Sequence, residues 1–365
     1  MVHRNLFFIA LLLGCAPTEQ VTLAESVPRE TTLDRPDVPN APDVWLDMID
    51  HATRSLDLAE FYISDQPGSK LHAVLDAVER AAARGVHVRL LVDATFYAKY
   101  PEVPDAWSHR ANMEVRHLDL KPGVLHAKYF VVDGREAYVG SQNFDWRSLE
   151  HIVEMGARVR APHVVAAVES IFAADWDAAG GKPFRLAVSR LSDGSITLGA
   201  SPKKLVPENL WDLPRLLTWI GDAKKTLRVQ SLTYKTKNRD GSPFHDLDDA
   251  VRAAAARGVS VELLVSTWTE KDEAVASLAK VPHVVVRVLD IPKFSGGDIP
   301  FARVAHAKFA VFDDSRAWLG TGNWEGDYFL ASRNLSLFFD HDDTARELGR
   351  VFDDEWQSVY ARPPR

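Results

Sequence analysis

HAKYFVVDGREAYVGSQN, at residues 126–143, recurs as HAKFAVFDDSRAWLGTGN at residues 306–323. In both copies the histidine is followed by a lysine after two residues, an aspartate after seven, a glycine after fourteen and an asparagine after seventeen. One His-x-Lys-x4-Asp pattern alone is weak, because it arises by chance in roughly a few per cent of chains of this length. Two copies at identical spacing, each ending in Gly-Ser/Thr-x-Asn, indicate a duplicated functional unit.

Each copy predicts a strand, a turn and a second short strand. Alternate side chains of a strand share one face, so His126 and Lys128 point the same way, as do His306 and Lys308. The second strand of each copy delivers a hydroxyl and a carboxamide to the mouth of the sheet: Ser141 and Asn143, Thr321 and Asn323. Each copy therefore offers an imidazole, an ammonium, a hydroxyl and a carboxamide.

Two such sets of side chains together suit the cleavage of a phosphodiester. Lysine ammoniums neutralise the negative charge that develops on the non-bridging oxygens, and asparagine amides donate hydrogen bonds to the same atoms. One imidazole attacks phosphorus while the other protonates the departing oxygen, and water then hydrolyses the phosphohistidine. Because the copies hold no pair of carboxylates for a metal, the sequence predicts neither a metal nor another cofactor.

The same residues also have structural interpretations. A lone histidine on a strand is more often a core residue, and a lone lysine more often packs its stem along the surface. Repetition at fixed spacing favours catalytic roles for the histidines, lysines and asparagines instead. Asp133 and Asp313 each end a strand at a turn, so we predict a turn-capping role for them rather than chemistry. Together with Ser141 and Thr321 they are assigned as structural support.

The doubled motif resembles that of the phospholipase D superfamily. Four stretches resemble in particular the animal lysosomal single-stranded nucleic-acid exonucleases often named as phospholipases D, with poxvirus envelope relatives nearby: GVLHAKYFVVD, VGSQNFDWRSLE, IPFARVAHAKF and LGTGNWEGDYF. The resemblance implies two similar α/β halves with one active site at their interface. It also implies a covalent phosphohistidine, usually on the histidine of the first motif, and no requirement for metal.

Members of that superfamily commonly carry an acidic residue eleven positions after the motif asparagine. Glu154 fills this place in the first half, whereas Asn334 fills it in the second. A carboxylate beside His126 would raise its basicity and fix its tautomer. We therefore predict that Glu154 orients His126 as the nucleophile, and that His306 is the general acid.

An internal repeat extends beyond the motifs and sets the predicted fold class. ERAAARGVHVRLLVD (79–93) matches VRAAAARGVSVELLVS (251–266), each an Ala-rich helix that ends at Arg-Gly and leads into an alternating strand. This order predicts an α/β fold with mixed β-sheets flanked by helices, arranged as a pseudo-dimer of residues 43–190 and 200–365 with one shared active site. Seven extra residues precede the second motif, around KFSGGDIPFAR, and we expect this loop to border the substrate entrance.

The first residues predict export. Arg4, the apolar run LFFIALLLG and Cys15 resemble a signal peptide that ends in a bacterial lipobox over residues 1–15. Cys15 is the only cysteine in the chain, and lipidation would account for a lone thiol in an exported protein. The alternative is an ordinary cleaved leader that discards Cys15. Residues 16–42 are polar and Pro-rich, which predicts a flexible tether.

These features predict a lipoprotein anchored to the membrane of a bacterial envelope, or otherwise a secreted or periplasmic protein. The hydrophobic share of 46% and the charged share of 26% are typical of a globular protein. The net charge of −8 argues against a broad basic surface, yet it permits a narrow positive groove. No obligate protein partner is implied.

The motif indicates the reaction but leaves the substrate open. A single-stranded nucleic acid is favoured by the resemblance, and it would need aromatic faces for its bases: candidates are Phe96, Tyr97, Tyr100, Phe144, Trp146, Trp268, Phe294 and Trp324. The alternative is a phospholipase D that hydrolyses phospholipid headgroups or transfers the phosphatidyl group. A non-catalytic surface scaffold is a remote third possibility, because degeneration would have erased part of a motif and both motifs are intact.

Overall fold

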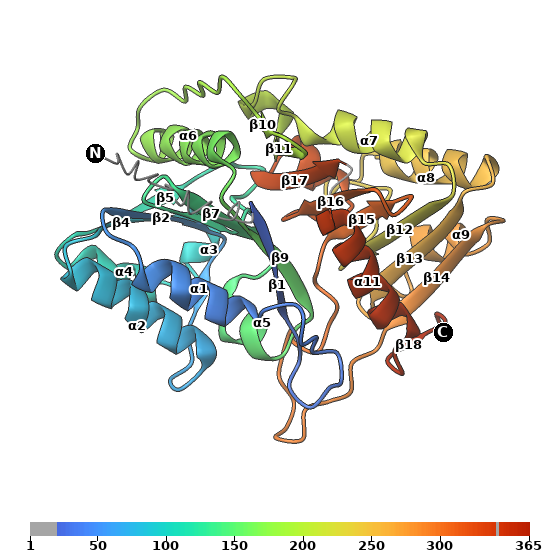
Figure 1. The fold of residues 1–365 in the computed structure, drawn as a ribbon, viewed down its shortest axis with the longest axis horizontal. Coiled ribbons are helices and arrows are strands. Elements are labelled where there is room, and N and C mark those ends of the chain that lie inside the picture. The colour runs from blue at the N-terminus through green and yellow to red at the C-terminus, as the bar shows by residue number, and fades with distance from the viewer. Residues whose placement is uncertain (1–19, 341–342) are drawn as a thin grey trace, which may run out of the picture.

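The computed structural model describes residues 20–340 and 343–365. The predicted signal peptide and Cys15 lie outside these residues. Two halves, each a twisted sheet with helices packed on it, lie side by side (Figure 1). The predicted α/β class with two similar halves is therefore confirmed.

The sheet of the first half has seven strands. Their spatial order is β1 (Val21–Ser26), β9 (Glu154–Val159), β7 (Glu136–Gly140), β6 (Tyr129–Val132), β2 (Ser55–Glu60), β4 (His87–Asp93) and β5 (Met113–Leu118). Strands β2, β4 and β5 run parallel, and the other pairs are antiparallel. Strands β3 (Ile63–Ser64) and β8 (Phe144–Asp145) pair in parallel as a separate two-stranded sheet.

The sheet of the second half repeats this order. It runs β10 (Ser192–Asp193), β11 (Ile196–Ser201), β17 (Asn334–Asp340), β16 (Arg316–Gly320), β15 (Phe309–Phe312), β12 (Thr226–Ser231), β13 (Ser260–Ser266), β14 (Val284–Leu289) and β18 (Ala361–Arg362). In spatial order, the seven strands β11, β17, β16, β15, β12, β13 and β14 correspond to β1, β9, β7, β6, β2, β4 and β5 of the first sheet. Strands β10 and β18 are added at the two edges. Both motif hairpins, β6–β7 and β15–β16, occupy the same interior place in their sheets.

The helices also fall into two corresponding sets. Those of the first half are α1 (Ala41–Asp50), α2 (Lys70–Ala83), α3 (Ala94–Tyr97), α4 (Glu102–Ser108), α5 (Trp146–Glu150) and α6 (Pro162–Ala179). Those of the second are η1 (Lys203–Leu205), α7 (Asp212–Asp222), α8 (Asp246–Ala256), α9 (Glu273–Leu278), α10 (Gly326–Leu330) and α11 (Asp343–Gln357). The Ala-rich helices α2 and α8 end as predicted, because Gly85 and Gly258 adopt positive φ angles of 96° and 92°.

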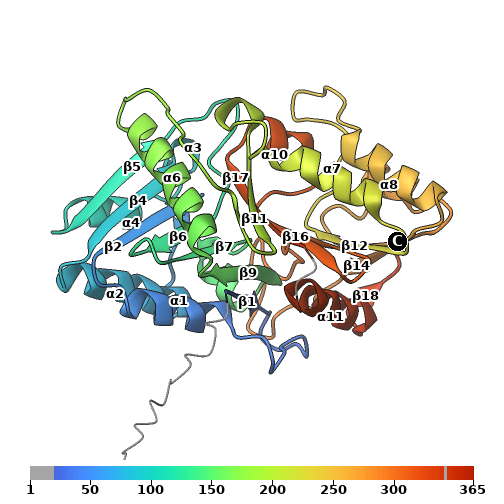
Figure 2. The ribbon, with the colours of Figure 1, turned by 45° about the horizontal axis from the view of Figure 1, so that its top comes forward.

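Three cores hold the layers together. One lies under α1 and α2, a second under α7 and α8, and the largest lies between the two sheets. Helices α6 and α11 fill this central core from the two halves (Figure 2). Their aromatic pairs are core residues as predicted, with Phe172 stacked on Trp176 and Phe352 on Trp356.

The predicted tether over residues 16–42 is wrong for the residues that the structure describes. Val21–Ser26 forms β1, which pairs antiparallel with β9 from Val21 opposite Val159 to Ser26 opposite Glu154. Leu33 and Val38 are buried in the central core. The polar and proline-rich composition misled the prediction, because the few apolar residues of this segment are the ones that the sheet buries.

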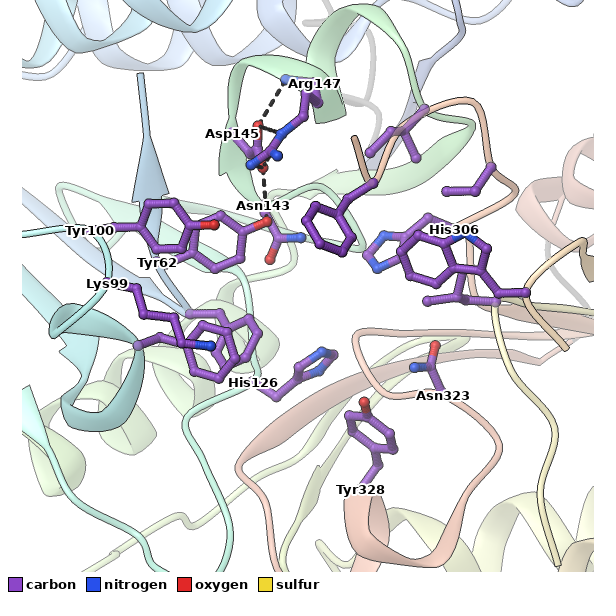
Figure 3. Close-up of a pocket in the computed structure, with 17 residues that line it drawn as sticks. Tyr62, Lys99, Tyr100, His126, Asn143, Asp145, Arg147, His306, Asn323 and Tyr328 are labelled. Atoms are coloured by element: carbon purple, nitrogen blue, oxygen red, sulfur yellow. Dashed lines mark hydrogen bonds and ion pairs between the residues drawn. The ribbon is translucent and has the colours of Figure 1, made fainter. Parts of the chain in front are cut away.

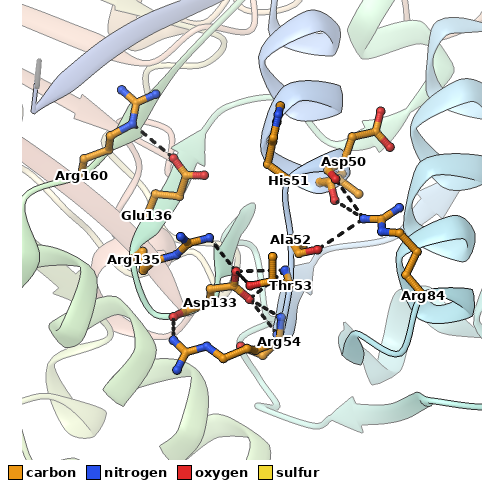
Figure 4. Close-up of polar contacts among 12 residues, drawn as sticks. Asp50, His51, Ala52, Thr53, Arg54, Arg84, Asp133, Arg135, Glu136 and Arg160 are labelled. Atoms are coloured by element: carbon orange, nitrogen blue, oxygen red, sulfur yellow. Dashed lines mark hydrogen bonds and ion pairs between the residues drawn. The ribbon is translucent and has the colours of Figure 1, made fainter.

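The aspartates of the two motifs hold the hairpins to the rest of each half, and Figure 4 shows the contacts of Asp133 in the first half. Asp133 accepts hydrogen bonds from the backbone amides of Thr53, Arg54 and Ser55 and from the Thr53 hydroxyl. Asp313 accepts hydrogen bonds from the backbone amides of Lys224, Lys225 and Thr226, at the start of β12. Both residues have positive φ, of 56° and 51°, as turn residues. Each carboxylate therefore binds the backbone that leads into the neighbouring strand, and not the backbone of its own turn.

A buried ion pair joins the two halves. Arg333, at the start of β17, makes a bidentate contact of 2.8 and 2.9 Å with Asp175 of α6, and it also donates to the carbonyl of Ser201. Both charged side chains are fully buried.

Within the described residues, no helix combines the length and the apolar character needed to cross a membrane.

Candidate active site

The two motifs meet because each one hydrogen-bonds the backbone of the other half. The amides of His306 and Ala307 donate to the carbonyl of Val153, at 2.8 and 2.9 Å. In the corresponding place, the amides of His126 and Ala127 donate to the carbonyl of Arg333, at 3.0 and 2.8 Å. Each histidine therefore lies beside the first residue of a strand that belongs to the opposite half.

Both histidines face one cavity of about 510 Å³ (Figure 3). Asn143 and Asn323 line the same cavity, one from each half. Their side-chain oxygens are buried and have no hydrogen-bond partner among the described residues. The structure thus brings the predicted histidines and asparagines together around one space that polar groups of a substrate can enter.

The carboxylate of Glu154 contacts His306 and not His126, so the predicted partnership is wrong. Glu154 Oε2 lies 2.7 Å from His306 Nδ1 across the interface. The reason is the hydrogen bond from the amide of His306 to the carbonyl of Val153, because Glu154 directly follows Val153 in the sequence. Ser141 and Ser148 donate to the two oxygens of Glu154, at 2.5 and 2.9 Å, and fix its orientation.

His126 has a neutral partner instead. Its Nδ1 lies 3.0 Å from Asn334 Oδ1, which also accepts from the hydroxyl of Thr321 at 2.9 Å. The amide nitrogen of Asn334 donates to the carbonyl of Tyr328, so its oxygen must face the ring. An acceptor at Nδ1 puts the proton there and leaves His126 Nε2 with its lone pair. Ser141 and Thr321 thus support the partners of the histidines, as motif support was predicted to do.

The two partners make the histidines electrostatically unequal. Burial, followed by the charges of Lys128 and Lys308, holds the pKa of His126 well below its usual range. Burial also lowers the pKa of His306, to about 4, against the raising effect of Glu154. A carboxylate stabilises an imidazolium, whereas a carboxamide does so far less. His306 is therefore the ring better placed to carry a proton, and His126 is the ring better placed to stay neutral.

The lysines are buried beside the histidines. The ammonium groups of Lys128 and Lys308 donate to the carbonyl oxygens of His126 and His306, respectively, two residues earlier. Burial, followed by the nearby charge of Lys308, holds the pKa of Lys128 well below its usual range. Burial lowers the pKa of Lys308 to about 7, with Glu154 opposing the shift. Two lysines so close together, each able to carry a proton, favour an anion in the cavity.

Aromatic rings form the wall that the first half contributes. Phe61 and Phe96 lie 3.9 Å apart between ring centroids, and Tyr62 stacks on Tyr100 at 4.7 Å. Phe61 also contacts the ring of His126, at 5.0 Å. Phe61 and Tyr62 were not among the sequence candidates. Their position directly after a strand that neighbours the motif hairpin was the signal that could have found them.

Three of the aromatic residues suggested for base stacking line the cavity: Phe96, Tyr100 and Trp268. The other five lie elsewhere: Tyr97, Phe144, Trp146, Phe294 and Trp324. Phe144 and Trp324 belong to the cores under the outer helices, while Trp146 and Phe294 line a separate pocket of about 280 Å³. Aromatic residues that follow strands mostly pack inward, which explains why Phe144 and Trp324 do not line the cavity.

The loop that precedes the second motif borders the cavity, as predicted. Phe301 and Val304 of this loop line it, and Val304 packs with Ile152 and Leu232 into a small apolar cluster. Phe301 is 70% exposed and meets the half-exposed ring of Trp268 edge to face, at 6.3 Å. The second half therefore contributes both aromatic and aliphatic side chains to the wall.

The part of the chain that the structure describes contains no group of three or more His, Cys, Asp or Glu side chains placed to hold a metal ion. Three carboxyl groups among the described residues lie at or near the site: Glu154 is bound to His306, Glu60 is buried near Lys128, and Asp145 lines the cavity and is paired with Arg147.

Comparison with known proteins agrees with this geometry. The family model described as "Cardiolipin synthase, PLD-like domain" matches residues 45–176 and 216–356, one match in each half. "Phospholipase D Z" of Dictyostelium discoideum is 29% identical, over 94% of this chain and 90% of that protein. The human "5'-3' exonuclease PLD4" is also 29% identical, over 94% of this chain and 78% of that protein. The phosphatidylserine synthase of Haemophilus influenzae shares the fold, with a TM-score of 0.65 at 12% identity over 88% of this chain and 85% of that one.

Proposed function

Because this chain belongs to the family of PLD-like domains, we propose that it is a phosphodiesterase whose single active site is shared by its two halves. Family membership confirms the resemblance seen in the sequence and the class of enzyme that it implied. The observation that carries the proposal is the meeting of His126, His306, Asn143 and Asn323 around one cavity, with two buried lysines beside them.

The unequal partners of the histidines support the following sequence of steps. His126 Nε2 attacks phosphorus, while His306 gives its proton to the departing oxygen and its charge is supported by Glu154 before the transfer. His306, now neutral, then takes a proton from the water that attacks the phosphohistidine, which releases His126. Lys128, Lys308 and the asparagine amides stabilise the negative charge on the phosphoryl oxygens throughout. We keep the roles predicted from the sequence, with His126 as nucleophile and His306 as general acid. The reason differs, because Glu154 contacts the acid His306 and not the nucleophile.

Single-stranded nucleic acid is the proposed substrate. The clustered rings of Phe61, Phe96, Tyr62 and Tyr100 offer aromatic surface for bases directly beside His126. Base stacking on such rings contributes on the order of 1–3 kcal/mol per base and tolerates any sequence. The human relative carries the name of a 5'-3' exonuclease.

Phospholipid is the second candidate. The aliphatic cluster of Ile152, Leu232 and Val304, with the exposed rings of Trp268 and Phe301 at its edge, offers an apolar surface for acyl chains. The Dictyostelium relative carries the name of a phospholipase D.

The two candidates are separated by incubating the protein in EDTA with a 5′-hydroxyl single-stranded oligodeoxynucleotide and, separately, with phosphatidylcholine vesicles. We expect stepwise shortening of the oligonucleotide and no release of choline. Release of choline without cleavage of the oligonucleotide would establish the phospholipase instead. Loss of turnover in EDTA that a divalent ion restores would show that charge stabilisation comes from a metal and not from the lysines.

We further propose that the protein is exported and anchored through a lipid on Cys15. Five residues separate Cys15 from the start of β1 at Val21, and an extended chain of that length spans at most about 18 Å. With β1 fixed in the sheet, such an anchor would hold the enzyme at the membrane surface. Metabolic labelling with a radioactive fatty acid tests the anchor, and equal labelling of a Cys15→Ala variant would exclude it.

A further inference from the structure

Glu60 is a buried carboxyl group next to the catalytic centre that the proposed steps leave unused. Its side chain is 1% exposed, and its Oε2 has no hydrogen-bond partner among the described residues. Glu60 is the last residue of β2, and Phe61, which follows it, lines the active-site cavity. An unpaired carboxyl in such a place costs stability, so its presence asks for a functional account.

Strand register places Glu60 opposite Lys128. Strand β2 pairs antiparallel with β6, with Leu58 facing Phe130 and Ala59 facing Tyr129. Lys128 directly precedes β6, and continuing the register by one residue sets it opposite Glu60. Directly opposed side chains in antiparallel strands have Cβ atoms about 5 Å apart. Lys128 Nζ also lies over the ring of Phe61, 5.0 Å from its centroid.

The second half carries a different residue in this place. Strand β12 pairs with β15, with Val229 facing Ala310 and Gln230 facing Phe309, so the next pair is Ser231 and Lys308. The hydroxyl of Ser231 donates to the carbonyl of Thr233. Lys128 therefore lies opposite a carboxyl group on the neighbouring strand, whereas Lys308 lies opposite a hydroxyl that already donates a hydrogen bond.

The charged groups around this pair explain why an asymmetry matters. Lys128 feels the like charge of Lys308 and the opposing carboxyls of Glu154 and Glu60. Burial raises the pKa of Glu60 well above its usual range, with Lys128 working against the shift. His126 lies two residues before Lys128, and the charge of Lys128 lowers its pKa. The phenols of Tyr129 and Tyr138 are further titratable groups near Glu60.

We propose that Glu60 is a positioning residue that shares one proton with Lys128 and so supplies an ammonium at Lys128 only when a phosphate is present. This rests on the proposed phosphodiesterase function. In the free site the proton is on the Glu60 carboxyl, Lys128 is a neutral amine, and two adjacent cations are avoided. Among the described residues, Glu60 and Lys128 form no ion pair within 4.0 Å, so the transfer requires the two side chains to approach. When the phosphodiester anion enters and they do so, the proton passes from the Glu60 oxygen to Lys128 Nζ, leaving a carboxylate and an ammonium. No proton is exchanged with solvent.

The proposal predicts how activity depends on pH when the carboxyl is removed. In Glu60→Gln, Lys128 must take its proton from solvent, so the decline of kcat/KM at alkaline pH moves to lower pH by about one unit. On a single-stranded oligodeoxynucleotide we expect kcat/KM within about threefold of wild type at pH 5.5 and about tenfold lower at pH 8. Glu60→Ser, which installs the residue of the second half, should behave like Glu60→Gln. Ser231→Ala, the matched change in that half, should leave the alkaline decline at its wild-type pH.

A parallel loss of kcat/KM at every pH would overturn the proposal, because it would indicate a purely structural role. An unchanged profile would overturn it as well. Thermal unfolding of each variant shows whether the fold is retained.

A second measurement does not depend on turnover. Sulfate, an anion of fixed charge, is titrated calorimetrically at pH 8 into wild type and Glu60→Gln in two buffers of different ionisation enthalpy. We expect the variant to take up about one proton more per bound sulfate than wild type. Equal proton uptake, or no sulfate binding in either protein, would overturn the proposal. A wild-type enzyme that cleaves neither substrate would refute the proposed function and leave this titration as a separate test.

Discussion

Glu154 and Asn334 occupy equivalent places in the two halves, and each serves the histidine of the other half. The sequence located both residues but assigned Glu154 to the histidine of its own motif. Local spacing could not reveal the exchange, because it depends on hydrogen bonds between Val153 and the start of the second motif. In a duplicated chain, the partner of a motif residue is fixed by the interface and not by distance along the sequence.

Glu154→Gln should impair the general acid rather than the nucleophile. Without the carboxylate, His306 carries its proton less readily, so kcat for an oligonucleotide should fall by about 10²- to 10³-fold. A p-nitrophenyl phosphodiester, whose leaving group needs no proton, should lose far less. Steady-state kinetics on both substrates measure the difference. Glu150→Gln, which changes a nearby carboxylate that contacts neither histidine, serves as the control. Equal losses on both substrates would mean that Glu154 does not act through the acid.

At the scale of single elements, most of the fold was readable from the sequence. The motif hairpins, the Ala-rich helices and the turns at Gly85 and Gly258 each follow from local periodicity and from residues that suit one backbone conformation. Strand β1 was missed because Val21–Ser26 acquires its structure from pairing with β9, more than a hundred residues away. Its local composition resembles a linker, and only the tertiary partner makes it a strand.

Asp133→Asn should weaken the attachment of the first hairpin to the loop before β2. Burial acts to raise the pKa of Asp133, but hydrogen bonds from Ser55, Thr53 and Arg54 outweigh it and lower the pKa to about 2. A carboxyl group whose pKa is lower in the folded chain stabilises the fold above its ordinary pKa near 4, and this contribution is lost as pH falls towards 2. We expect the variant to lose about 2 kcal/mol of unfolding free energy at pH 7 and almost nothing at pH 2.

Urea denaturation at several pH values measures this contribution. The exposed Asp314→Asn is the control, because its contact with Arg228 lies at the surface and should contribute less than about 1 kcal/mol. A loss for Asp133→Asn that is the same at pH 7 and near pH 2 would contradict an electrostatic origin.

At the scale of the whole molecule, the two halves must stay in register for the site to exist. The buried pair of Arg333 and Asp175 crosses their interface, and removing one partner strands a charge in the core. Arg333→Leu should therefore cost about 3–5 kcal/mol of unfolding free energy, whereas Arg333→Leu with Asp175→Leu should cost less. Chemical denaturation of the single and double variants checks the order. A double variant less stable than the single one would show that packing, and not the stranded charge, dominates.

The central claim is that both halves complete one site, in which His126 is the nucleophile and His306 the acid. Its most direct test is to mix His306→Ala with a p-nitrophenyl phosphodiester, to quench under alkaline conditions that preserve phosphohistidine, and to locate the adduct by mass spectrometry. The account predicts an adduct on His126 in this variant and no adduct in His126→Ala, because an easy departure needs no acid while the nucleophile is indispensable. An adduct on His306 in His126→Ala would contradict it.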